Sequence, residues 1–264
     1  MSLGPMSSGR RHIALEGVYN IRDLGGYATA QGTQTAWRRF LRADSPHALT
    51  EDGQARLQAE GLATVIDLRT EAEITETPNP FARRAGVAYA HRPLFAALAP
   101  GKLAETADGA CPLLGFYQSA LDDRHEALHD IMTLIAGAGE GAVMFHCTAG
   151  KDRTGLVAAL LLGLAEVSPD DIVADYALTE GLIADLVAGF LETARQRGGD
   201  VTAYARLLAA PAATMRDTLG HLETRYGSVP HYLTHIGVAP GDISALSDRL
   251  HDTSVPSATV RKSG

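Results

Sequence analysis

The sequence predicts an α/β protein, in which a small parallel-dominated sheet is flanked by helices and followed by a helical C-terminal part. Two short runs, 64–69 and 142–146, are rich in β-branched or apolar residues and predict strands, and each follows a helix-like segment. Such alternation of helices and strands is typical of a parallel sheet that is covered on both faces. Beyond residue 168 the pattern is mostly helical.

The elements of the N-terminal half follow from local start, stop and strand signals. A helix is expected over 50–60, because Gly61 follows it as a stop signal, and the strand at 64–69 comes next. A weaker strand pattern covers 86–91. Residues 95–114 show no clear pattern and contain several Pro and Gly residues, so we expect a long mobile loop there. Such loops are often functional, and this one could cover a site as a lid, as could the C-terminal helices.

The second half begins with a helix over about 117–136 and the strand at 142–146. A buried helix is expected to follow from Thr154 onward. The Ser-Pro-Asp-Asp sequence at 168–171 predicts another helix, since Ser caps a helix, Pro suits its first position and acidic residues favour its first turn. Further helices are expected at 181–196, 202–210, 213–226 and 242–250.

Composition and charge indicate a globular chain with unpacked tails. Of 264 residues, 45% are hydrophobic and 20% are charged, and no apolar run reaches the roughly 18 residues needed to cross a membrane. We expect 1–12 to be a disordered tail or cloning remnant, 13–252 to form a single domain, and 253–264 to be a disordered tail. The net charge of -8 argues against nucleic acid or anionic lipid surfaces as general partners.

The sequence contains two cysteines, Cys111 and Cys147. Two are too few for a disulfide framework, and alone they make a poor zinc site. The sequence therefore predicts a reducing, cytoplasmic location, although export without a cleaved signal stays compatible with it. Cys111 has no distinctive neighbours and is expected to be a small inert apolar residue.

The strongest functional signal is the segment His146-Cys147-Thr148-Ala149-Gly150-Lys151-Asp152-Arg153-Thr154-Gly155. A cysteine ends a strand, five residues form a loop, and an arginine stands at the start of a helix. Backbone N–H groups in such a loop converge on an anion, and the positive end of the helix adds to their field. The same field favours a thiolate at Cys147, while Arg153 can hold two phosphate oxygens. The expected phosphate contacts are Thr148, Ala149, Gly150, Lys151 and Thr154.

This segment resembles the signature of the cysteine-dependent phosphatases, Cys-x5-Arg followed by Ser or Thr. The fuller string is similar to that of the bacterial tyrosine and dual-specificity phosphatases, some of which also act on phosphoinositides. Segments 20–26, 67–73, 172–176 and 226–228 resemble other elements of that family. The resemblance extends over about 13–250 and implies the fold of the cysteine-dependent phosphatases.

The resemblance also implies a reaction in two steps. Cys147 would attack phosphorus to give a phosphocysteine, with Arg153 and the loop amides on the equatorial oxygens, and water would then release phosphate. The substrate would be phosphotyrosine, with phosphoserine, phosphothreonine and phosphoinositide as further candidates, so the partner is a phosphorylated protein or phospholipid. Lys151 favours a second acidic group on the substrate. The loop would also bind inorganic phosphate or a similar anion, and no metal or other cofactor is implied.

The general acid is less clear from the sequence. Many tyrosine phosphatases carry an Asp on a separate loop upstream of the cysteine, but the corresponding residues 94–99 contain no acid. Glu105 and Asp108 are the nearest acids in that region. Asp152 resembles the loop aspartate of some phosphoinositide phosphatases, and we predict that Asp152 is the general acid.

Charged residues outside the loop have a structural and a functional interpretation. His146 is expected to orient the loop in preference to transferring a proton. Asp67 and Arg69 end a strand at the sheet edge where α/β proteins bind ligands, so they either contact the substrate or support the loop as an ion pair. Arg22 and Asp23 likewise either contact the substrate or form an ion pair that fixes the N-terminal turn.

Three other functions compete with this interpretation. A nucleotide-binding P-loop fails, because Phe145 stands where that motif has its first Gly and Asp152 where it has Ser or Thr. A rhodanese-like sulfurtransferase also uses a cysteine in an anion-binding loop, and it would form a persulfide on Cys147 without releasing phosphate. The third is a catalytically inactive phospho-binding module, which the intact Cys147, Arg153 and Thr154 disfavour.

Overall fold

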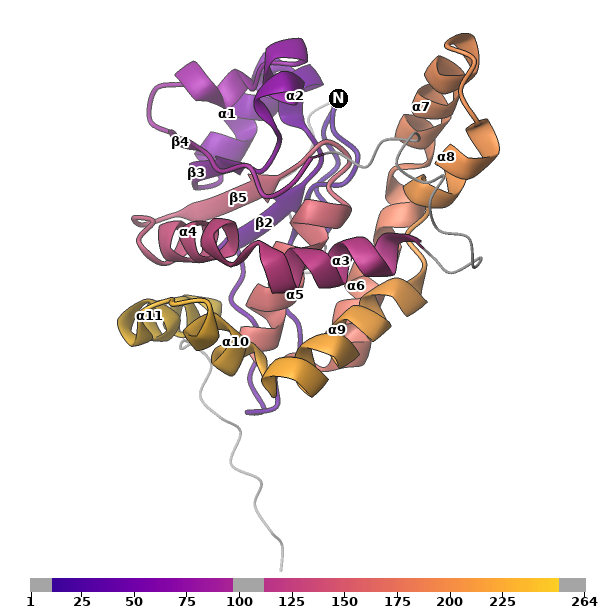
Figure 1. Cartoon of the computed structure of the whole chain (residues 1–264). Helices are drawn as coiled ribbons and strands as arrows, with labels where there is room; N and C mark the ends of the chain where they lie inside the picture. The colour runs from indigo at the N-terminus through magenta and orange to yellow at the C-terminus, as the bar shows by residue number, and fades with distance from the viewer. Residues whose placement is uncertain (1–10, 97–111, 252–264) are drawn as a thin grey trace, which may run out of the picture.

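The computed structural model describes residues 11–96 and 112–251 and shows a five-stranded sheet with helices on both faces (Figure 1). The strand order is β1-β2-β5-β3-β4, and all neighbours are parallel except the antiparallel edge pair β1 and β2. The predicted parallel-dominated sheet is therefore confirmed. The strands are β1 (Arg22–Asp23), β2 (Phe40–Ala43), β3 (Leu62–Asp67), β4 (Ala88–His91) and β5 (Ala142–His146).

Helices make up most of the remainder of the described chain. Within it, no helix is both long and apolar enough to cross a membrane. The α-helices are α1 (Glu51–Ala59), α2 (Glu71–Glu76), α3 (Pro112–Asp123), α4 (His125–Ala136), α5 (Asp152–Leu164), α6 (Pro169–Leu182), α7 (Ala184–Gln196), α8 (Val201–Leu208), α9 (Ala212–Tyr226), α10 (Val229–His235) and α11 (Pro240–Leu250), and the 3-10 turns are η1 (Pro46–Ala48) and η2 (Pro80–Arg83).

Side-chain caps explain where several of these helices begin. Thr50 accepts a hydrogen bond from the backbone N–H of Gly53 at the start of α1, and Ser168 caps α6 in the same way, as its sequence predicted. A capping box opens α2, in which Thr70 and Glu73 each accept from the backbone N–H of the other. This box fixes the orientation of Glu73, which becomes important at the active site.

The structure differs from the sequence prediction at several elements. The helix predicted over 117–136 is two helices, α3 and α4, which meet at Arg124. The short α2, β1 and β2 were not predicted, and neither was α10, where Pro230 is tolerated because it lies in the first turn. Pro112 begins α3, so the irregular segment ends earlier than 114.

Parts of the predicted tails and loop fall outside the described residues. Glu105, Asp108 and Cys111 lie there, as do 1–10 and 252–264. Arg11 belongs to the predicted N-terminal tail but contacts the domain, since its guanidinium donates hydrogen bonds to the carbonyls of Gly25 and Gly26.

Each face of the sheet has its own hydrophobic core. Alternate residues of β5 point to opposite faces, as in any strand. Val143 and Phe145 therefore join the larger core with α4 and α5, whereas Ala142 and Met144 join a smaller core that includes Leu57 of α1. Because β5 is the central strand and is buried throughout, the residue that follows it lies at the middle of the sheet edge.

Candidate active site

The signature loop, residues 147–153, connects the carboxyl end of β5 to the first turn of α5. Cys147 is the first residue after the strand, is 2% exposed and has no disulfide partner. Gly150 has φ +66°, and a Cβ at this position would lie 2.5 Å from the carbonyl oxygen of Ala43. Only glycine allows the loop to approach β2 so closely in this conformation.

Donors behind the loop orient its peptide groups. Asn20 Nδ2 donates hydrogen bonds to the carbonyls of Ala149 (2.9 Å) and Gly150 (3.0 Å), and Arg42 Nη2 donates to Gly150 (2.8 Å). In a trans peptide the N–H points away from the carbonyl. The N–H groups of Gly150 and Lys151 are therefore directed to the opposite side of the loop from these donors, as an anion site requires.

A buried ion-pair network holds the donors behind the loop. Asp175 of α6 pairs with Arg22 (Nε–Oδ1 2.8 Å) and with Arg42 (Nη1–Oδ2 2.5 Å), and all three side chains are fully buried. Burial alone would raise the pKa of Asp175, but the two guanidinium groups outweigh it and hold that pKa well below its usual range. Of the two interpretations of Arg22 and Asp23, burial of both side chains favours a structural role over substrate contact. They form no ion pair with each other, however, since Asp23 accepts from backbone N–H groups.

We expect Asp175→Ala to lower the free energy of unfolding by about 3–5 kcal/mol, because it leaves two buried guanidinium groups without a counter-charge. Urea unfolding followed by circular dichroism measures the change. Glu180→Ala, which removes an exposed carboxylate from the same helix, is the control and should change stability by less than about 0.5 kcal/mol. Equal effects of the two substitutions would show that the network contributes little.

Arg153 is held by Glu73, a residue that the sequence analysis did not single out as a site residue. Arg153 donates from Nη1 to Glu73 Oε2 (2.7 Å) and from Nη2 to Oε1 (2.8 Å), and Thr148 Oγ1 also donates to Glu73. This end-on pairing leaves the Nε–H group without an acceptor among the described residues, so Nε–H is available to an anion. Burial alone would raise the pKa of Glu73. The hydrogen bonds and charge of Arg153 outweigh burial and bring that pKa down to about 2, so the pair stays ionised at neutral pH.

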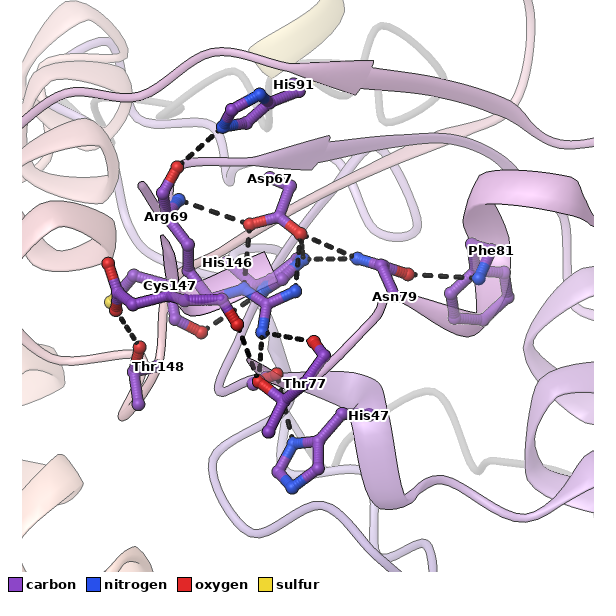
Figure 2. A network of polar contacts seen from close by, with 12 residues as sticks. His47, Asp67, Arg69, Thr77, Asn79, Phe81, His91, His146, Cys147 and Thr148 are labelled. Carbon is purple, nitrogen blue, oxygen red and sulfur yellow. Dashed lines mark hydrogen bonds and ion pairs between the residues drawn. The ribbon is translucent and has the colours of Figure 1, made fainter. Parts of the chain in front are cut away.

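His146 connects the loop to a second ion pair, between Asp67 and Arg69 (Figure 2). Arg69 donates to Asp67 twice, from Nε (2.9 Å) and Nη2 (2.7 Å). His146 Nδ1 lies 3.1 Å from the carbonyl of Cys147, and Nε2 lies 2.7 Å from Asn79 Nδ2. Nε2 also lies 3.3 Å from Asp67 Oδ2, which connects the imidazole directly to the ion pair.

The Asp67–Arg69 pair is fully buried, so of its two interpretations the structure favours support of the loop over contact with substrate. Figure 2 shows the pair beside His146, at the carboxyl ends of β3 and β5. His146 likewise contacts the backbone of Cys147, as expected of an orienting residue.

A cavity of about 110 Å³ opens onto the loop. Its floor includes Cys147, Asp152 and Arg153, so the structure brings together the three predicted catalytic residues. Its upper wall comes from α7 and α8, which lie beside one another at the right of Figure 1. The full lining is Phe95, Cys147, Thr148, Ala149, Asp152, Arg153, Phe190, Tyr204, Leu207 and Leu208.

The family model described as the tyrosine phosphatase family matches residues 13–252. The chain belongs to this family. A Cupriavidus necator protein provisionally named a tyrosine-protein phosphatase is 30% identical and covers 85% of this chain and 84% of its own length. A tyrosine-protein phosphatase of Nostoc commune is 32% identical (80% and 74%), and the triple specificity protein phosphatase PtpB of Mycobacterium tuberculosis is 27% identical (88% and 96%). The predicted family, fold and phosphatase activity are thereby confirmed.

Asp152 of this tyrosine phosphatase lies in the first turn of α5 and faces the catalytic cavity. Its Oδ1 accepts a hydrogen bond from the Tyr117 hydroxyl (2.6 Å), and Lys151 Nζ lies 3.3 Å from the same oxygen. Burial, reinforced by the nearby carboxylate, raises the pKa of Tyr117 well above its usual value, so Tyr117 remains a donor. These contacts use one oxygen of Asp152 and leave Oδ2 for a reacting proton.

Two loop residues of the tyrosine phosphatase are not placed as predicted. The Lys151 side chain is 1% exposed and does not line the cavity; its ammonium donates to the carbonyls of Leu207 and Ala209 (2.8 Å) at the C-terminal end of α8. The Thr154 hydroxyl neither caps α5 nor contacts the sulfur: it is buried and has no hydrogen-bond partner among the described residues. α5 begins at Asp152, two residues earlier than Thr154.

Across residues 11–96 and 112–251, no group of three or more His, Cys, Asp or Glu side chains is arranged to hold a metal ion. The groups that face the cavity are a thiol, a guanidinium, a carboxyl and backbone amides, which suit phosphoryl transfer through a covalent intermediate.

Proposed function

We propose that this tyrosine phosphatase hydrolyses phosphotyrosine monoesters through a phosphocysteine intermediate on Cys147. The observation that carries the proposal is the convergence of Cys147, Arg153 and Asp152 on one cavity at the amino end of α5. The helix end and the loop N–H groups, which face the site because the carbonyls of Ala149 and Gly150 are held on the opposite side, favour a phosphate dianion there. Because active thiolates are readily oxidised, the reducing cytoplasm is the location that suits this chemistry.

In the first step the Cys147 thiolate attacks phosphorus, and the bond between phosphorus and the tyrosine oxygen breaks. Arg153 and the loop N–H groups stabilise the equatorial oxygens, and Asp152 gives its proton to the leaving oxygen. In the second step a water attacks phosphorus, Asp152 takes a proton from that water, and the P–S bond breaks to restore the thiolate. Phosphate then leaves.

The experiment that tests this function is trapping of the intermediate. The wild-type protein is mixed with p-nitrophenyl phosphate or a phosphotyrosine peptide, quenched in acid during turnover, digested and examined by mass spectrometry. We expect phosphate release and one phosphoryl group on the peptide that contains Cys147. Absence of phosphate release would overturn the proposal, and a persulfide formed from thiosulfate would favour the sulfurtransferase. Phosphate release with the label on another residue would overturn the assignment of Cys147.

Asp152→Asn is expected to lower kcat/KM, which reports formation of the phosphocysteine, about 10²–10³-fold for phosphotyrosine, whose leaving group needs a proton, and much less for p-nitrophenyl phosphate. The dependence on the leaving group separates loss of the acid from a general disturbance of the site. Asp170→Asn, in the first turn of α6, is the matched control and should leave both rates unchanged. Equal losses for both substrates would reassign the general acid.

A further inference from the structure

A second cavity, of about 330 Å³, adjoins the catalytic cavity. Thr148 and Phe190 line both cavities. Glu73 connects them as well, since its carboxylate holds Arg153 in the first cavity and also lines the second. The loop residue next to the nucleophile is therefore part of the wall between the two spaces.

The size of the catalytic cavity makes the second one relevant to the substrate. The catalytic cavity, of about 110 Å³, can hold a phosphate group but not a phosphopeptide. The part of a substrate beyond the phosphate must extend past the walls of this cavity. The neighbouring cavity, three times as large, lies directly behind two of those walls.

Acidic side chains line the second cavity. Three acidic residues line it, Asp44, Glu73 and Glu76, and no Lys or Arg does. Glu73 is paired with Arg153, and Asp44 is buried, which raises its pKa although it accepts from backbone N–H groups, so neither offers a free charge. Glu76 at the end of α2 is exposed and forms no ion pair with a described residue. Its charge is available to a ligand.

Aromatic side chains complete the lining. Tyr19 is one of two large hydrophobic residues in the described chain that remain exposed (39%), and Phe190 forms another wall. His47 lies beside them, and its Nδ1 is 3.1 Å from the Ser45 hydroxyl. An aromatic face next to a free carboxylate is a favourable environment for a Lys or Arg side chain, through cation–π attraction and charge pairing.

We infer that the second cavity binds a Lys or Arg side chain close to the phosphorylated tyrosine, so that the enzyme prefers basic phosphopeptides. The inference rests on the proposed function, which places the phosphoryl group at Cys147. Two further observations support it. The net charge of -8 attracts basic substrates from a distance. The loop ammonium of Lys151, which would otherwise favour a polyanionic substrate, is occupied by carbonyls at the end of α8.

The test uses phosphotyrosine peptides that differ only in having Arg, Ala or Glu at the positions that flank the phosphotyrosine. The quantity measured is the ratio of kcat/KM for the Arg peptide to that for the Glu peptide. For the wild type we expect a ratio of about ten, from one charge pair and one cation–π contact. Glu76→Gln and Tyr19→Ala should each lower it about threefold, and Glu76→Lys should invert it.

Glu71→Gln is the matched control, because Glu71 is an exposed glutamate on α2 that does not line the cavity. Glu71→Gln should leave the ratio unchanged. If Glu71→Gln and Glu76→Gln changed the ratio equally, the preference would come from the protein's overall negative charge and not from the cavity, which would overturn the inference. So would equal kcat/KM for the three peptides, or a phosphoinositide hydrolysed faster than the Arg peptide. Turnover of p-nitrophenyl phosphate, measured alongside, separates these results from failure of the proposed function itself.

Discussion

Cys147→Ser is expected to lower kcat for p-nitrophenyl phosphate by about 10⁴-fold or more, to the background of the assay. The serine hydroxyl has nearly the same size as the thiol, so the buried site keeps its shape. It does not ionise at neutral pH, however, and the field of the loop and the helix end cannot make it a comparable nucleophile. Stopped assays of phosphate release measure the loss.

Binding separates this loss of chemistry from a loss of structure. The serine variant should still bind a slowly hydrolysed phosphotyrosine peptide, because Arg153, Glu73 and the loop amides remain. Cys111→Ser is the control, and we expect full activity from it because the sequence gives Cys111 no distinctive context. Residual activity of Cys147→Ser within tenfold of the wild type would show that another residue is the nucleophile.

The fold could be predicted where the sequence signal is local. The apolar run at 142–146 coincides with β5, and the cap at Ser168 coincides with the start of α6. β2 could not be predicted, because its residues Phe-Leu-Arg-Ala include a charge that is normally exposed. Arg42 is buried there only because Asp175, 133 residues away, compensates it. The local sequence around Arg42 gives no sign of an ion-pair partner that only the folded chain brings near.

In the candidate active site, too, the residues with a local sequence signal could be predicted and those that depend on distant contacts could not. The signature loop is contiguous, so Cys147 and Arg153 could be found from spacing alone. Glu73 reaches Arg153 from α2, 80 residues away, and its role depends on how the capping box turns its side chain. The sequence placed Lys151 correctly in the loop but could not show that its ammonium contacts the end of α8. Side-chain direction is set by tertiary contacts.

Arg153→Lys is expected to lower kcat by about 10³-fold although the charge is retained. In the structure the guanidinium uses Nη1 and Nη2 for Glu73, and its Nε–H group remains for the phosphate. An ammonium group cannot make these two planar contacts at once, so it either pairs with Glu73 or follows the phosphate oxygens. Most of the loss should appear in kcat, since the oxygens gain charge as the transition state forms.

Two measurements test the Arg153 prediction. The first is the same substitution in a surface ion pair: Arg84→Lys, beside Glu51, should leave kcat within about twofold of the wild type.

The second measurement is the pH dependence of the loss in kcat caused by Arg153→Lys. With a pKa of about 2 in the folded protein, Glu73 contributes its stabilisation fully above its unfolded pKa and loses it only as pH falls toward 2. The deficit of Arg153→Lys should therefore be constant between pH 5 and 8. A deficit that disappears within that range would show that Glu73 does not hold the arginine during catalysis.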